Sequence, residues 1–125
     1  MSEGIVGIDH VQIAAPPDCE EEARRFFAGV LGLAELEKPA PLAARGGVWF
    51  AAGAQQLHVG VEPGFAPARK AHPALLVEAD RLDYVAARLA AAGAPVEWDG
   101  ELARRRRFYT ADPWGNRIEL IAVRG

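Results

Sequence analysis

An internal repeat constrains the fold of this chain more than any other feature. His72 follows His10 by 62 residues, and Glu119 follows His58 by 61 residues. Each half shows the same predicted order of a strand, a helix and three further strands. One such βαβββ module of about 60 residues cannot cover its own sheet well. The repeat therefore predicts an α+β fold, in which two tandem modules form a curved mixed sheet around a cleft with the helices on its outer face.

The first module is expected over about residues 5–62. It opens with a strand over 5–14 that is rich in β-branched residues. Asp18 is a candidate N-cap for a helix over residues 20–31. The remaining strands of this module are expected at 34–38, 48–52 and 56–61.

The second module is expected over about residues 72–123, after a linker over 63–71. It opens with a short apolar strand over 72–77. Asp80 is the candidate cap of a helix over residues 82–92. The remaining strands of this module are expected at 95–98, 106–110 and 117–123.

Composition excludes several classes of function. With 125 residues the chain forms one domain, and its net charge of −3 disfavours nucleic acid as a partner. No apolar run approaches the roughly 20 residues of a membrane span. The single cysteine, Cys19, excludes a disulfide within the chain, which fits a reducing compartment. We therefore expect a cytoplasmic protein without nucleic-acid or membrane partners.

Four side chains at repeat-related strand positions are candidate metal ligands. His10 matches His72 on the opening strands, and His58 matches Glu119 on the closing strands. Strand alternation places His58 and Glu119 opposite the apolar residues of their strands, so both face the concave side. Imidazole nitrogens and a carboxylate suit a first-row divalent ion such as Zn, Ni, Fe, Mn or Co. His58 has a second interpretation, as a substrate-binding group or proton carrier.

The chain resembles the vicinal oxygen chelate superfamily. This group includes glyoxalase I, fosfomycin-modifying thiol transferases, bleomycin-resistance proteins and extradiol dioxygenases. The resemblance covers nearly the whole chain in the expected order. It rests on IDHVQIA at 8–14, FFAGVLGL at 26–33, QLHVGVE at 56–62, HPALLVEAD at 72–80 and, most specifically, FYTADPWGNRIEL at 108–120.

The resemblance implies a single glyoxalase-like domain over residues 1–125 with a bound divalent metal ion. It makes His10, His72 and Glu119 metal ligands, and it aligns His58 with the fourth ligand of glyoxalase I, which is commonly Glu. It also implies a homodimer of exchanged or apposed modules, in which the ligands of one ion can come from two chains.

The implied function is that of a metal-dependent lyase or isomerase, or a transferase, acting on a small oxygen-chelating substrate. Glu119 would then also move a substrate proton, with His58 as a second catalytic group. Gln12 stands where fosfomycin thiol transferases carry Thr, which disfavours that activity. The alternatives are a drug- or metabolite-sequestering protein of the bleomycin-resistance type without turnover, and a dimeric interaction module.

Several polar and aromatic residues are candidates for substrate binding. Gln12 shares a strand face with His10. Arg105 and Arg107 are alternate members of a run of four arginines that leads into the strand with Tyr109. The candidates are Gln12, Trp49, Arg105, Arg107 and Tyr109.

Overall fold

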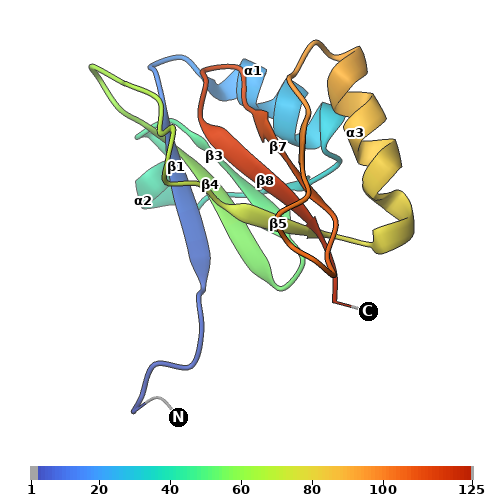
Figure 1. Cartoon of the computed structure of the whole chain (residues 1–125). Helices are drawn as coiled ribbons and strands as arrows, with labels where there is room; N and C mark the ends of the chain where they lie inside the picture. The colour runs from blue at the N-terminus through green and yellow to red at the C-terminus, as the bar shows by residue number, and fades with distance from the viewer. Residues whose placement is uncertain (1–2, 125) are drawn as a thin grey trace.

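The computed structural model describes residues 3–124, which form two four-stranded mixed sheets (Figure 1). In the first sheet the strand order is β1-β4-β3-β2, and in the second it is β5-β8-β7-β6. The outer strand β1 or β5 runs parallel to its neighbour, whereas the other pairs are antiparallel. The strands are β1 (His10–Ala15), β2 (Ala34–Leu36), β3 (Val48–Ala52), β4 (Gln55–Val61), β5 (Ala74–Val77), β6 (Glu97–Asp99), β7 (Arg107–Ala111) and β8 (Arg117–Ala122). The predicted α+β class and the paired βαβββ modules are confirmed.

A helical segment covers one face of each sheet. In the first module α1 (Glu20–Ala23) continues as the π-helical η1 (Arg24–Val30), and η1 packs against β2 and β3. In the second module η2 (Ala79–Arg81) leads into α3 (Leu82–Ala91), which packs against β7 and β8. A further short helix, α2 (Ala40–Ala43), follows Pro39. The sequence pattern did not predict α2.

One apolar core joins the two modules. Phe27 and Phe50 from the first module and Leu89 and Phe108 from the second are fully buried in the same cluster. The Arg88 guanidinium on α3 donates to the Val30 carbonyl at 3.0 Å, which links the helices of the two modules. Within residues 3–124, no helix is long and apolar enough to span a bilayer.

Asn116 fastens the second module to the first. It is 1 % exposed, and its Nδ2 donates to the Ala14 carbonyl at the end of β1 and to Asp112 Oδ2, both at 2.8 Å. Its Oδ1 accepts the backbone N–H of Ala68 at 2.9 Å. One side chain therefore holds β1, the segment between the modules and the start of β8 in a fixed relation.

The predicted first strand is too long at its N-terminal end. β1 begins at His10, whose register partner is Gln56, and β4 begins only one residue earlier, at Gln55. Residues 5–9 therefore extend past the sheet, and Figure 1 shows this segment running away from the body of the molecule. Its apolar residues are exposed, with Val6 at 98 % and Ile8 at 69 %.

Both predicted helix caps are wrong. Cys19 occupies the N-cap position of α1, without a side-chain capping bond, and Asp18 has a φ of 65°. Asp80 lies inside η2, which begins after Glu78. The Asp18 side chain cannot serve as predicted, because a left-handed turn separates it from the helix start.

Candidate functional site

His10 and His58 lie side by side on the face of the first sheet that is turned away from the core. Their rings stack with centroids 4.2 Å apart, although β1 and β4 are far apart in sequence. The Nδ1 of His10 donates to Asp9 Oδ2 at 2.9 Å, and the Nε2 of His58 donates to Gln56 Oε1 at 2.8 Å. Each imidazole is thus oriented by a hydrogen bond from one ring nitrogen, and this bond does not use the second ring nitrogen.

Trp49 completes a row of three stacked rings. Its indole lies 3.9 Å from the His58 ring at an interplanar angle of 4°. Covered in this way, His58 is only 5 % exposed, and burial, followed by the effect of His10, lowers its pKa. A lowered pKa favours the neutral imidazole, which is the form that binds metal ions.

His72 and Glu119 form the corresponding pair on the second sheet. His72 precedes β5, and its Nε2 lies 2.9 Å from Glu119 Oε1 on β8. The Nδ1 of His72 donates to the Lys70 carbonyl at 2.8 Å. Glu119 is 5 % exposed, so its carboxylate interacts mainly with its two protein partners, His72 and Arg107, rather than with water.

Arg107 is the second partner of Glu119. Its Nη1 lies 3.3 Å from Glu119 Oε2, and its Nη2 lies 2.6 Å from Asp99 Oδ2 on β6. Tyr109 lies on the same strand face, with the Arg117 guanidinium 3.8 Å from its ring centroid. This half of the site therefore joins two carboxylates, two arginines and an aromatic ring, with the Arg107 guanidinium shared between both carboxylates.

The other predicted substrate-binding residues take different positions. Gln12 lies on the His10 face of β1, and its amide covers Gly60 so closely that a Cβ there would be 2.7 Å from Gln12 Nε2. Arg105 donates through Nε and Nη2 to the Ala122 carbonyl at 3.0 and 2.8 Å. The structure thus places Gln12 beside the first histidine pair, and Arg105 at the end of β8.

The four predicted ligands form two pairs rather than one cluster. Among the residues that the structure describes, no three His, Cys, Asp or Glu side chains converge as a metal site. His10 and His58 belong to one sheet, whereas Glu119 belongs to the other and His72 lies just before its strand β5. Each module therefore carries two donors of a possible four-ligand set.

Three neighbours of these pairs escaped sequence reasoning. Asp9 orients His10, and Asp99 holds Arg107, but neither belongs to the repeat. Lys38 contributes positive charge near His58. The sequence could have indicated Asp99, because extending the expected strand over 95–98 by one residue places Asp99 opposite Arg107 in the hairpin.

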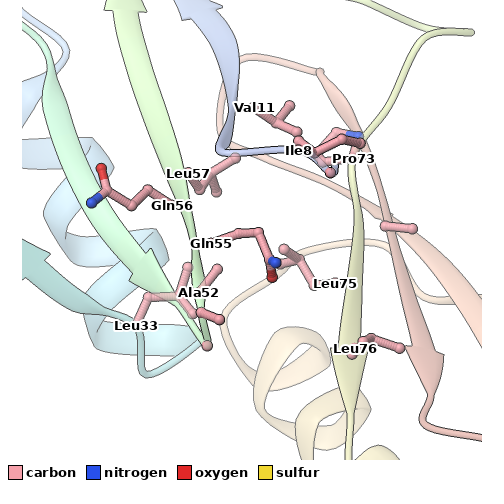
Figure 2. Close-up of a pocket in the computed structure, with 14 residues that line it drawn as sticks. Ile8, Val11, Leu33, Ala52, Gln55, Gln56, Leu57, Pro73, Leu75 and Leu76 are labelled. Carbon is pink, nitrogen blue, oxygen red and sulfur yellow. The ribbon is translucent and has the colours of Figure 1, made fainter. Parts of the chain in front are cut away.

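An apolar groove of about 690 Å³ separates the edges of the two sheets. Figure 2 shows Ile8 and Val11 near Pro73, with Leu57 and Leu75 on the strands that line the groove. Ile8 and Val11 are 69 % and 39 % exposed. The outer edges β1 and β5 therefore present apolar surface that this chain does not cover.

Comparison with known families and structures gives a consistent result. Residues 12–121 match the family model described as a glyoxalase-like domain. No curated protein matches the chain. A solved structure from Bacillus anthracis, provisionally described as a glyoxalase family protein, is 47 % identical; the match covers 98 % of each chain with a TM-score of 0.91.

More distant structures share the fold. Lactoylglutathione lyase from Agrobacterium tumefaciens is 19 % identical, with 96 % of each chain covered and a TM-score of 0.74. The E126Q mutant of the fosfomycin resistance protein FosX from Listeria monocytogenes, complexed with Mn(II) and a dihydroxypropylphosphonic acid, is 16 % identical. That match covers 94 % of this chain and 92 % of the other, with a TM-score of 0.77.

Proposed function

Because the chain belongs to the glyoxalase-like domain family, we propose that it is a divalent-metal-dependent enzyme acting on a small substrate with neighbouring chelating oxygens. The observation that carries the proposal is the pairing of His10 with His58 and of His72 with Glu119 on equivalent faces of the two sheets. Three imidazoles and a carboxylate form a donor set for a first-row ion. Two positions of an octahedral ion would remain for substrate or water.

The surroundings of the four side chains fit a metal ion. His10 and His72 both direct Nδ1 to an oxygen acceptor, the arrangement that orients metal-binding imidazoles with Nε2 toward the ion. The 2.9 Å between His72 Nε2 and Glu119 Oε1 also fits. Two ligands about 2.1 Å from one ion, and at right angles to each other, are about 3 Å apart.

We propose that a second copy of the chain completes the site. Each module holds two of the four proposed donors, so the His10–His58 pair of one chain would face the His72–Glu119 pair of its partner. The edges that would meet carry exposed apolar residues, including Val6, Ile8 and Leu76. Burial of such surface is the usual driving force of association.

In this proposal the bound ion would supply Lewis-acid polarisation of a substrate oxygen. Glu119 would accept a proton from the substrate carbon next to that oxygen and return it to a neighbouring atom. Its low exposure keeps competing water away from the carboxylate. Arg107 would hold a developing negative charge on the substrate, and Gln12 would orient the substrate by hydrogen bonds. Neutral His58 would be the fourth ligand or a second proton acceptor.

Metal analysis tests the proposal. Protein purified without chelator should contain a divalent ion, and Glu119→Gln should weaken its binding by at least about tenfold, the lower bound for loss of an orienting group. Glu62→Gln, which removes an exposed carboxylate, is the matched control. Two results together would contradict the proposal: wild-type protein that contains no divalent ion, and a Glu119→Gln variant whose affinity for the ion equals that of the wild type. Tight binding of a small molecule that survives chelator, with no turnover, would instead support the sequestering alternative.

A further inference from the structure

A small hollow lies next to the first histidine pair, bordered by Trp49 and Gln12. It has a volume of about 200 Å³ and is lined by residues of β1, β3, β4 and the α2 region. Trp49 belongs both to this hollow and to the stack on His58. One indole ring therefore borders the hollow and also contacts a proposed metal ligand. The volume is below the usual range for a whole small-molecule ligand, so the hollow suits one substituent of a larger substrate.

Two cationic side chains line the hollow. Lys38 is half-buried and Arg45 is exposed, and no Asp or Glu in residues 3–124 joins the lining. Arg45 has no ion-pair partner within the described part of the chain. Its five N–H donors are therefore available to a ligand.

Lys38 is held in place by one hydrogen bond and keeps further N–H donors for a ligand. Its ammonium group donates one hydrogen bond to the Gly46 carbonyl, and an ammonium group has three donors. Glu20 lies beside the same turn, but its Oε2 accepts the Gly47 N–H at 2.6 Å. Two cations against this single engaged carboxylate leave a local excess of positive charge.

Gln12 supplies a neutral donor to the same hollow. Its amide lies over Gly60, where any side chain larger than hydrogen would collide with Gln12 Nε2. Glycine at position 60 thus allows the amide to reach across the sheet surface. Gln12 also lines the hollow.

We propose that this hollow, the Lys38–Arg45 subsite, binds an anionic group of the substrate, such as a carboxylate, a phosphonate or a phosphate. Arg45 and Lys38 neutralise the charge of the anionic group, and Gln12 donates a hydrogen bond to it. Trp49 lies beside the part of the substrate that joins this group to the oxygens on the metal ion. The substrate class is then a small chelating molecule that carries a separate anionic group. As a statement about the substrate, the inference rests on the proposed function.

Binding of methylphosphonate to the full chain in the presence of EDTA tests the subsite separately from the metal. Nuclear magnetic resonance should detect saturable shifts of the Trp49 indole N–H and the Gln12 amide signals. Arg45→Ala should weaken binding about tenfold, as expected for loss of a charge-assisted hydrogen bond. Arg124→Ala, which removes an exposed charge at the C-terminal end, should bind like the wild type. The neutral ester dimethyl methylphosphonate should not bind.

Equal methylphosphonate binding by wild type and the Arg45→Ala variant, or no binding at all, would overturn the inference. Lys38→Met provides a second variant that keeps the aliphatic stem, and unfolding curves show whether the Gly46 turn remains intact. His72→Ala should retain methylphosphonate binding while losing metal. A protein that binds metal but not methylphosphonate refutes only the subsite, and one that binds methylphosphonate but no metal refutes the proposed function.

Discussion

The Nε2 of His72 and the Oε1 of Glu119 lie 2.9 Å apart, although 47 residues separate them in the chain. The parallel pairing of β5 with β8 creates this proximity, because it places Ala74 opposite Glu119. In the first module, the parallel pairing of β1 with β4 likewise brings His10 against His58. Each module thus completes one donor pair by itself, before any contact with the other.

A mixed dimer should reveal whether the two pairs serve one ion. One chain would carry His10→Ala with His58→Ala, and the other His72→Ala with Glu119→Gln. If the site is shared between chains, a mixed dimer has one site with all four donors and one with none. We expect about one bound ion per mixed dimer and none in either parent, measured by elemental analysis of doubly tagged complexes. A metal-free mixed dimer would contradict sharing between chains.

Alanine at Gly47 should destabilise the protein far more than alanine at Gly53. Both residues have positive φ, 87° and 62°. A Cβ on Gly47 would lie 2.3 Å from the Val59 carbonyl oxygen, whereas nothing lies within 4 Å of one on Gly53. We expect a loss of about 1–2 kcal/mol for Gly53→Ala from the backbone conformation alone, and about 3 kcal/mol or more for Gly47→Ala. Denaturant unfolding measures both, and equal losses would contradict the clash.

Glu20 should stabilise the folded protein near neutral pH and lose this contribution in acid. The Gly47 N–H that donates to its carboxylate lowers the pKa of Glu20. A lowered folded-state pKa gives stability that is fully present above the unfolded value of about 4.3 and is lost as the pH falls through the folded-state pKa. The difference in unfolding free energy between wild type and Glu20→Gln should therefore shrink below that pH. Glu62→Gln corrects for the change in net charge, and a difference that grows with acid would contradict the assignment.

Asn116→Ala should be strongly destabilising. The substitution leaves the Ala14 carbonyl and the Ala68 N–H without their partner at a position that is 1 % exposed. Unmade buried hydrogen bonds of this kind cost about 2–4 kcal/mol together. Thermal unfolding should show the loss, whereas Gln55→Ala, at an exposed amide, should change stability by less than about 0.5 kcal/mol. Similar losses in both variants would show that Asn116 does not fasten the modules.

The repeat predicted the fold because both halves carry the same hydrophobic pattern. Side-chain alternation also predicted that His58 lies on the sheet face opposite the apolar residues of its own strand. The strand start at His10 could not be predicted, because it depends on where the partner strand β4 begins rather than on the residues of 5–9 themselves. Local propensity favours a strand there, but a strand needs a partner.

The polar environment of the four candidate ligands was harder to predict than the strands that carry them. Asp99 meets Arg107 through strand register, and Lys38 lies in the loop between β2 and α2, where its ammonium group donates to the Gly46 carbonyl. Asp18 shows the opposite case, since its spacing from Glu21 suggested a cap that the left-handed turn prevents. Such contacts depend on tertiary geometry that a periodic pattern does not encode.

The flat stack of Trp49 on His58 gives the protein a built-in optical reporter. An indole 3.9 Å from an imidazole changes its emission when that imidazole gains a proton or a metal ion, because a charged ring quenches its neighbour. With Trp98 and Trp114 replaced by Phe, the remaining fluorescence would come from Trp49 alone. Events at the first histidine pair could then be followed in real time without a label and without knowledge of the substrate.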